Sequence, residues 1–321
     1  MFSQEVLQID PRLVAEQVET AISRVVLGVL RRRGAVVGMS GGIDSSVVAA
    51  LCVRALGRER VLGLLMPERD SSRDAPRLGR MLAEQLGIEC VEEDISGTLA
   101  ALGCYDRQIE AIRKVFPEYG EGWRCKLVLP SLLEGDRLNI ARLVVADPDG
   151  HERSSRMPPA AYLQMVAATN FKQRTRMMIE YYHADRLHFA VAGTPNLVEY
   201  DQGFFVKEGD GAADFKPIAH LYKSQVYALA EYLEVPQEIR DRQPTTDTFS
   251  LSQTQEEFYF ALSYREMDLC LWAVDHGVPA VQVGPAIGLT EEQVVRVFRD
   301  IEAKRRVSRY LHHVATPMSR P

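Results

Sequence analysis

A glycine-rich turn between two apolar runs most constrains the fold of this chain; it lies in AVVGMSGGIDSSVVAALC, residues 35–52. The first run, residues 35–37, predicts a buried strand, and apolar residues at helical spacing over residues 47–51 predict a helix. Between them, Gly41 and Gly42 let an anion approach bare backbone N–H groups at the positive end of the helix dipole. The segment therefore predicts a phosphate-binding turn that joins a strand to a helix.

The spacing of the glycines excludes two common nucleotide-binding turns. No Gly-Lys-Ser/Thr follows, and Gly38, Gly41 and Gly42 do not fall in the order G-x-G-x-x-G. Asp44 would repel a phosphate unless a cation lay between them, so we expect bound Mg²⁺ beside it. A simpler alternative is that Asp44 and the serines only cap the helix. We also expect Asp44 to face solvent, so that its replacement would leave the fold nearly unchanged.

Strands and helices alternate through the first third of the chain, after an amphipathic helix with Asp10 as its N-cap and Pro11 in its first turn. The alternating elements are strands near 35–40, 61–66 and 88–94 and helices near 44–56 and 76–86. This order predicts an α/β fold, a doubly wound parallel sheet with flanking helices, whose ligands bind beyond the carboxyl ends of the strands. Further along, we expect a long helix over 158–183, a strand over 187–192 and a loop over 193–217.

The alternation stops between residues 102 and 159, where short apolar runs surround the turn sequence DPDG. Strands are predicted for these runs, at 123–130, 138–146 and 151–157. We interpret residues 102–159 as an inserted β-hairpin element, with Tyr119 and Trp123 filling a small core of its own. The insert contains none of the polar motifs described below, so we expect it to serve recognition or an interface and to lie outside the core chemistry.

Composition excludes several classes of protein. The 321 residues, 46% of them hydrophobic, can bury a substantial core. The net charge of −6 comes from 38 basic and 44 acidic residues without a long block of one sign, so binding to nucleic acid or a membrane surface is not expected. No apolar run is long enough to span a bilayer, and no signal peptide is expected, because the N-terminal residues lack an apolar h-region followed by a small-residue cleavage site. Five cysteines without a C-x-x-C pair favour a reducing compartment, and we expect a cytoplasmic protein.

A second acidic residue, Glu199, stands just past the strand expected at 187–192, as Asp44 stands just past the first strand. The doubly wound topology predicts that both carboxylates reach the same edge of the sheet, where they can share one Mg²⁺. Arg174 and Arg176 lie two positions apart on the long helix and therefore point to different faces. At most one of these arginines is expected to meet a given ligand group.

Six segments, in collinear order, resemble the motifs of the NAD synthetase family, which belongs to the N-type ATP pyrophosphatases. They are SGGIDSS at 40–46, NFKQRTRM at 170–177, GT with Glu199 at 193–199, GFFVKEGDGAAD at 203–214, LYKSQV at 221–226 and PTTD at 244–247. The first motif is shared across the superfamily, and the later ones are specific to NAD synthetases. The resemblance implies an adenine nucleotide alpha hydrolase-like fold, in one domain over residues 1–321 without a glutaminase domain. It also implies amidation of deamido-NAD to NAD through an adenylated nicotinate carboxylate, with ammonia as the nitrogen donor and AMP and pyrophosphate as products.

The same resemblance assigns roles to individual residues. It implies Mg²⁺ on Asp44 and Glu199, stabilisation of the triphosphate by Lys223, and transfer of a proton from ammonium to Asp210. The implied ATP contacts are Ser40, Gly41, Gly42, Ile43, Asp44, Ser45, Ser46, Arg176, Thr194, Lys223 and Thr245. The implied deamido-NAD contacts are Asn170, Arg174, Lys207 and Asp214. A homodimer and, for glutamine use, a separate glutamine-hydrolysing partner are the associations that the family suggests.

Two other functions stay open at this point. A related adenylating amide ligase acting on a different carboxylate would keep the same pyrophosphate loop, and a non-catalytic ATP-binding subunit would use that loop for binding alone. The chain also departs from the family, because it has Thr254-Gln255-Glu256 where T-D-E is usual, and its insert is longer than in the compact ammonia-dependent enzymes. Retention of Asp44, Glu199, Asp210 and Lys223 favours a working enzyme over a binding subunit.

Overall fold

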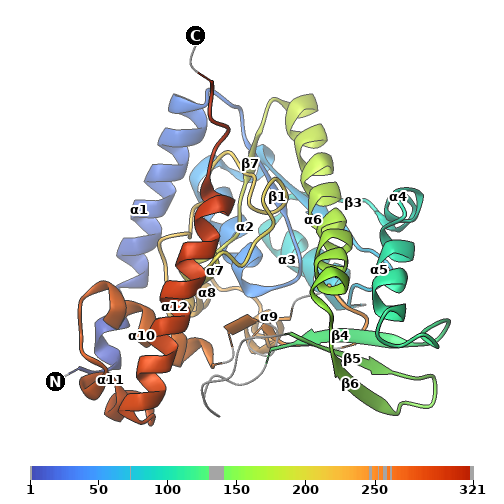
Figure 1. The fold of residues 1–321 in the computed structure, drawn as a ribbon. Coiled ribbons are helices and arrows are strands. Elements are labelled where there is room, and N and C mark those ends of the chain that lie inside the picture. The colour runs from blue at the N-terminus through green and yellow to red at the C-terminus, as the bar shows by residue number, and fades with distance from the viewer. Residues whose placement is uncertain are drawn as a thin grey trace.

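The computed structural model describes residues 2–72, 74–129, 141–245, 248–251, 253–255, 259–260 and 262–318. At its centre is a four-stranded parallel sheet in the order β3-β2-β1-β7 (Figure 1). The strands are β1 (Ala35–Gly38), β2 (Val61–Leu65), β3 (Glu89–Glu92) and β7 (Ala190–Ala192). Val36 of β1 stands opposite Leu62 of β2 on one side and Val191 of β7 on the other. The predicted parallel sheet is confirmed.

Both faces of the sheet are covered, because the side chains of β1 alternate between two cores. Ala35 and Val37 pack into one core and Val36 into the other, and all three are fully buried. The helices that contribute to the first core are α1 (Pro11–Ser23), α2 (Ile43–Leu56), α3 (Asp74–Leu86) and α8 (Lys223–Tyr232). Those that contribute to the second are α4 (Ser96–Ala101), α5 (Cys104–Arg113) and α6 (Pro159–Leu187). The fold is therefore doubly wound, as predicted.

The strand order reverses at β1, which pairs with β2 on one side and with β7 on the other. The loops that follow β1 and β7 leave the same edge of the sheet in opposite directions and open a crevice between them. Ser40 lies in the loop after β1, and Thr194 lies in the loop after β7. Two motifs about 150 residues apart in the sequence are brought together by this topology.

Within residues 102–159 the structure contains α5 and a three-stranded antiparallel sheet in the order β4-β5-β6. The strands are β4 (Arg124–Val128), β5 (Arg142–Ala146) and β6 (Glu152–Arg156), and residues 130–140 lie outside the described residues. The start of the insert is helical, because Tyr105, Gln108 and Ile112 form one buried face at helical spacing. Tyr119 and Trp123 pack in the core of this part, as predicted.

The remaining helices complete the chain. They are α7 (Leu197–Gln202), α9 (Gln237–Asp241), α10 (Tyr264–Asp275), α11 (Ala280–Ile287) and α12 (Glu291–His312). Short 3₁₀ turns occur at Gln4–Leu7 and Arg58–Arg60, and a π-helical turn at Arg24–Val29 extends α1. Helix α7 lies in the segment that we predicted as a loop, since Asn196 caps a short helix of six residues there. Thr290 and Gln293 form the predicted capping box of α12.

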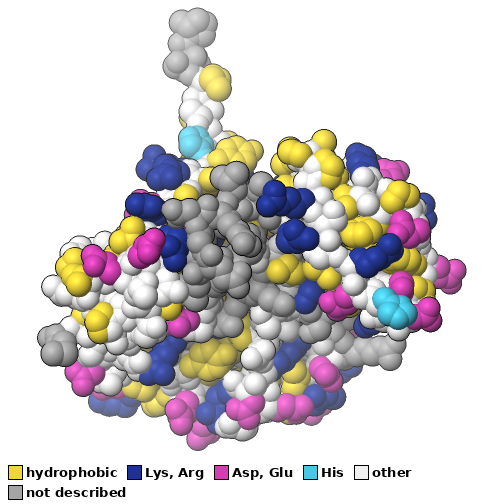
Figure 2. All heavy atoms as spheres, turned by 60° about the horizontal axis from the view of Figure 1, so that its bottom comes forward, with side chains coloured by type: hydrophobic (Ala, Val, Ile, Leu, Met, Phe, Trp, Pro, Cys, Tyr) yellow, Lys and Arg dark blue, Asp and Glu magenta, His cyan; other side chains and the backbone are white. Residues whose placement is uncertain are grey.

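The molecular surface agrees with the balanced composition of the chain. Figure 2 shows Lys, Arg, Asp and Glu side chains interspersed over the face that comes forward when the view of Figure 1 is turned. Within the described ranges, no helix is both long and apolar enough to cross a membrane.

Candidate active site

A pocket of about 660 Å³ opens at the carboxyl edge of the parallel sheet. The loop after β1 forms one side of it, with Ser40, Gly42, Ile43, Asp44 and Ser45 among the lining residues. Other walls come from the loop after β7, from α6, from the glycine-rich loop that follows α7, and from the insert. The two motifs that the topology brings together therefore border one cavity.

The turn after β1 has the geometry of an anion site. Gly41 has φ +70°, and a Cβ there would lie 2.7 Å from the carbonyl oxygen of Ala75, so glycine is required. Ser45 and Ser46 donate their hydroxyls to the Gly42 carbonyl at 3.0 and 2.8 Å, and Ser46 does not line the pocket. Gly42 is the N-cap of α2, and none of the described side chains caps that helix. The first N–H groups of α2 are therefore left for a ligand.

Asp44 and Glu199 are joined by one fully buried asparagine, Asn196. Its side-chain amide donates to Asp44 at 3.0 Å, and its backbone N–H donates to Glu199 at 3.1 Å. The Asn196 side-chain oxygen also accepts the Glu199 N–H at 3.1 Å, which completes a capping box at the start of α7. Burial, and next the charge of Asp44, raise the pKa of Glu199 to about 8. The two carboxylates that we predicted to meet do lie at one site.

Lys223 is placed behind Asp44 rather than in the pocket wall. Its side chain is 0% exposed, its ammonium group contacts the Asp44 carboxylate, and it stands 4.9 Å from the centre of the Tyr264 ring. Burial by itself would lower the pKa of Lys223, but the negative charges of Asp44 and Glu199 outweigh that effect, so the pKa is raised above its ordinary value. The Asp44 side chain is only 16% exposed. Our expectation that Asp44 faces solvent was therefore wrong, because it is half of a buried ion pair.

The pocket is also lined by Asp210, Glu180 and Arg176. Asp210 accepts a hydrogen bond from the Val206 N–H at 2.7 Å. Burial raises the pKa of Asp210 to about 6, although backbone hydrogen bonds and Arg176 oppose this shift. Burial, followed by repulsion from Asp210, raises the pKa of Glu180 to about 8, while Arg176 lowers it. Both groups can therefore exchange protons near neutral pH.

The residues predicted to contact ATP are mostly at the pocket. Arg176 lines it and donates to the Met66 carbonyl at 3.4 Å, and Thr194 and Thr245 line it as well. Gly41 shapes the turn without lining the pocket. Asp247 of the PTTD motif lies outside the described residues.

Only one of the four predicted dinucleotide contacts, Asn170, lines the pocket among the described residues. Arg174 donates to the carbonyl of Lys207 at 3.2 Å. The Lys207 ammonium donates to the carbonyls of Tyr310 and His313 at the end of α12, at 3.0 and 2.7 Å. Asp214 accepts the Val191 N–H at 2.7 Å and so pairs with the edge of β7. These three residues lie apart from the pocket. As predicted, Arg174 and Arg176 point in different directions.

Three functional candidates were not singled out from the sequence. Asn196 could have been found from its N-x-x-E capping-box spacing to Glu199. Glu180 stands four residues after Arg176, on the same helical face. Lys172, within NFKQRTRM, is buried and ion-pairs with Glu68 at 2.9 Å and Asp70 at 2.8 Å, which fixes the loop after β2 against α6.

The insert forms part of the pocket wall. Leu127 of β4 and Ala141 just before β5 line the cavity beside Tyr162 of α6. The insert therefore borders the pocket, and our expectation that it lies outside the core chemistry stays a prediction. The insert sheet packs its buried face against α5 and the first turns of α6.

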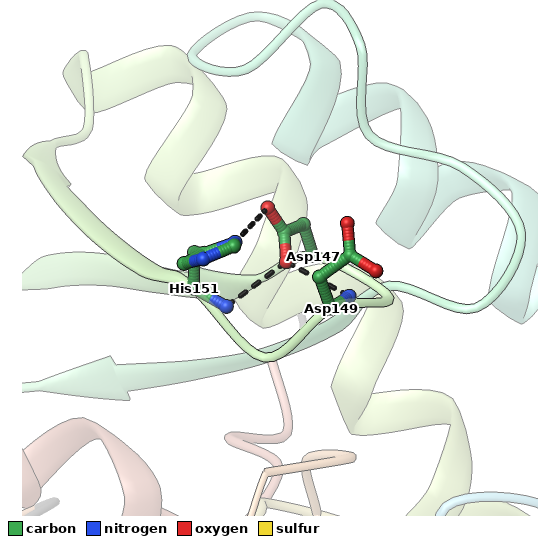
Figure 3. A group of neighbouring side chains, drawn as sticks. All are labelled: Asp147, Asp149 and His151. Atoms are coloured by element: carbon green, nitrogen blue, oxygen red, sulfur yellow. Dashed lines mark hydrogen bonds and ion pairs between the residues drawn. The ribbon is translucent and has the colours of Figure 1, made fainter.

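The tip of the β5–β6 hairpin carries a polar group formed by Asp147, Asp149 and His151, drawn in Figure 3. Asp147 accepts the backbone N–H groups of Asp149 and His151 at 3.0 and 2.9 Å. Its other oxygen lies 3.2 Å from the His151 ring, and Asp149 points away from this pair. These contacts are those of a side chain that stabilises a tight turn.

Comparisons with known proteins agree with one another. The family model described as NAD synthase matches residues 15–115 and 139–309. The NH(3)-dependent NAD(+) synthetase of Mesorhizobium japonicum is 62% identical over 306 residues, which cover 95% of this chain and 96% of that protein. The enzyme of the same name from Rhizobium meliloti is 59% identical, and the match covers 97% of this chain and 93% of that protein. The enzyme from Thermotoga maritima is 38% identical, and the match covers 76% of this chain and 80% of that protein.

Solved structures share the fold at lower identity. NMN synthetase from Francisella tularensis has a TM-score of 0.65 at 23% identity, covering 97% of this chain and 99% of that one. NH3-dependent NAD synthetase from Campylobacter jejuni has a TM-score of 0.63 at 22% identity, covering 97% of this chain and 100% of that one. Residues 116–138, which include β4, are left unmatched by the family model.

Proposed function

Because this chain belongs to the NAD synthase family, we propose that it catalyses the ATP-dependent amidation of deamido-NAD to NAD, with ammonia as the nitrogen donor. It is a ligase that forms a carbon–nitrogen bond. The observation that carries the proposal for the site is the pair Asp44 and Glu199, held together by Asn196 beside the uncapped start of α2.

The chemistry needs two steps, since a carboxylate is a poor electrophile. In the first, the nicotinate carboxylate oxygen forms a bond to the α-phosphorus of ATP, the bond to the bridging oxygen breaks, and pyrophosphate leaves. In the second, the ammonia nitrogen bonds to the carbonyl carbon and the carbon–oxygen bond to AMP breaks. The N–H groups at the start of α2 and the guanidinium of Arg176 are donors suited to the leaving pyrophosphate and the phosphates of ATP.

Magnesium fits the donor set of this pocket. Asp44 and Glu199 offer hard carboxylate oxygens, and burial followed by repulsion from Asp44 raises the pKa of Glu199, so a cation beside them would be favourable. Asp44 and Glu199 are therefore the proposed magnesium ligands. When bound, Mg²⁺ supplies neutralising charge to the triphosphate.

For the dinucleotide, we place Asn170 in the pocket and keep Arg174, Lys207 and Asp214 as predicted contacts. Because these three residues do not line the pocket, they would contact a part of the ligand that extends beyond it. Lys207 would have to exchange the α12 carbonyls for the ligand. Replacing Lys207 with Met should therefore raise KM for deamido-NAD and leave KM for ATP unchanged.

The proposed assembly is a homodimer. Support comes from three exposed apolar side chains of α6, which the helical period places within about 100° of one another around the helix axis, so that they form one apolar stripe. They are Leu163, Met178 and Tyr182, which are 65%, 55% and 62% exposed. Light scattering on the purified protein measures the oligomeric state directly, and addition of a glutamine-hydrolysing subunit with glutamine tests for a nitrogen-supplying partner. The free cysteines support a reducing compartment, the cytoplasm, as the location.

The direct test incubates the purified protein with ATP, Mg²⁺, ammonium and deamido-NAD. Formation of NAD, AMP and pyrophosphate in equal amounts is expected. Nicotinic acid mononucleotide in place of deamido-NAD tests for a ligase that acts on a different carboxylate, and faster turnover of that substrate would reassign the reaction. Binding of ATP without any product in either reaction would favour a non-catalytic subunit.

A further inference from the structure

Among the described residues, five acidic side chains line the pocket, and all but one of them accept a hydrogen bond or form an ion pair within the protein. Asp44 and Glu199 accept hydrogen bonds from Asn196, and Asp210 accepts one from the backbone N–H of Val206. Asp300 forms an ion pair with Lys304 at 2.7 Å. Within the described part of the chain, no donor forms a hydrogen bond or salt bridge with the fifth, Glu180. This carboxylate is therefore available to a ligand.

We propose that Glu180, together with Asp210, binds the ammonium ion that supplies the amide nitrogen. The inference rests on the proposed function and adds a residue to it. An ammonium ion carries one positive charge and four N–H donors, so it can satisfy two carboxylates at once. Asp44 already has a cation of its own in Lys223, so we place the ammonium ion at Glu180 and Asp210.

The position of Glu180 is fixed by the end of β1. A Cβ built on Gly38 would lie 2.3 Å from Glu180 Oε1, so the absence of a side chain at Gly38 creates the space that this carboxyl group occupies. Gly38 stands two residues before Ser40, at the base of the phosphate-binding turn. Glu180 thus reaches from α6 to the centre of the sheet edge, on which the reacting groups converge.

The charged groups acting on Glu180 favour a cation beside it. Burial, and next repulsion from Asp210, oppose the ionisation of Glu180, and the charge of Arg176 supports it. Because none of the described cations forms an ion pair with Glu180, its ionised form is costly, and a bound cation that donates hydrogen bonds removes that cost. Metal binding is expected instead at Asp44 and Glu199, which Asn196 holds together.

The proton balance of the second step also needs two acceptors. Ammonium loses one proton before its lone pair can attack the carbonyl carbon. After the carbon–nitrogen bond forms and the bond to AMP breaks, the nitrogen must lose another proton to become the neutral amide. Asp210 and Glu180 offer one carboxylate for each proton, and a carboxylate with a raised pKa is the better acceptor from ammonium.

The test measures KM for ammonium at saturating ATP and deamido-NAD in wild type, Glu180→Gln and Asp185→Asn. Asp185 is an exposed acid on the same helix and serves as the matched control. Glu180→Gln should raise KM for ammonium by about tenfold, because a charge-assisted contact is lost. Pyrophosphate release before ammonium is added should stay within about twofold of wild type in both variants, since ammonium takes no part in that step. An unchanged KM for ammonium in Glu180→Gln would overturn the proposal.

A second set of variants separates this role from a structural one. Gly38→Ala should displace the Glu180 carboxyl group and raise KM for ammonium by about tenfold. In a Glu180→Ala background the same Gly38→Ala change should have almost no further effect, because the displaced group is gone. An equal effect of Gly38→Ala in both backgrounds would contradict the proposal. If the wild-type protein forms no NAD at all, the proposed function fails, which is a separate outcome.

Discussion

The buried ion pair between Asp44 and Lys223 leads to a sharp prediction for Asp44→Asn. This change keeps the size of the side chain and removes its charge, which leaves the fully buried Lys223 ammonium without its contacting carboxylate. Removal of one partner of a buried pair costs about 3–5 kcal/mol of unfolding free energy. Because Asp44 is partly exposed and Tyr264 also faces the ammonium group, we expect about 3 kcal/mol, the lower end of that range.

The loss should depend on pH, with a definite sign. In wild type, burial and next the charge of Asp44 raise the pKa of Glu199 to about 8. In the variant the charge of Asp44 is gone, so Glu199 ionises at a lower pH than in wild type and becomes the counter-ion of Lys223, and the buried Lys223 also loses its proton more easily. The folded variant therefore binds fewer protons than the folded wild type as the pH rises, so the stability difference between them shrinks. The loss relative to wild type should be smaller at pH 9 than at pH 6.

Urea unfolding followed by far-ultraviolet circular dichroism, without nucleotide or metal, measures this loss. The control is the double variant Asp44→Asn with Lys223→Met, in which both charges are absent. It should recover at least half of the stability lost by the single change, because no unpaired charge is buried. A loss below about 1 kcal/mol at pH 6, or a double variant less stable than the single one, would refute the reasoning.

Three further predictions concern the site and the insert. Asn196→Ala should lower the unfolding free energy by about 1–2 kcal/mol through loss of the α7 cap and should abolish pyrophosphate release; release at the wild-type rate would contradict its bridging role. Asp210→Asn should still release one pyrophosphate per site while NAD formation falls by at least about 100-fold, and equal loss of both would show that Asp210 does not act in the ammonia step. Shortening the hairpin tip at 147–150 to a glycine-containing turn should leave ammonia-dependent NAD formation within about twofold, since the tip stands away from the lining residues. Loss of turnover in a shortened protein that folds and has the wild-type oligomeric state would place the tip in the active site.

Local patterns in the sequence were sufficient for the fold class and for one half of the site. Apolar runs at 35–37 and 61–65 with helices between them predict a parallel sheet, because each run must be buried on both faces. The turn with Gly41 and Gly42 predicts an anion site for a reason that is also local, since glycine permits φ +70° and leaves the N–H groups of α2 open. The Thr290 cap of α12 was likewise predicted from its neighbours.

Helix α5 was missed although its pattern is present in the sequence, since Tyr105, Gln108 and Ile112 form a buried face at helical spacing. The placement of the insert was not predictable in the same way. Whether β4 borders the pocket depends on how its sheet packs against α6, and no local pattern contains that information.

The partners of each charged residue were decided by the tertiary structure alone. Sequence placed Asp44 and Glu199 at one sheet edge but said nothing of Asn196 between them or of Lys223 behind Asp44. It could not distinguish Glu180, which faces the pocket, from Asp185, which faces solvent on the same helix. The physical reason is that backbone preference and hydrophobic period act over a few residues. The pKa and availability of a carboxylate depend on burial and on charges that come from distant parts of the chain.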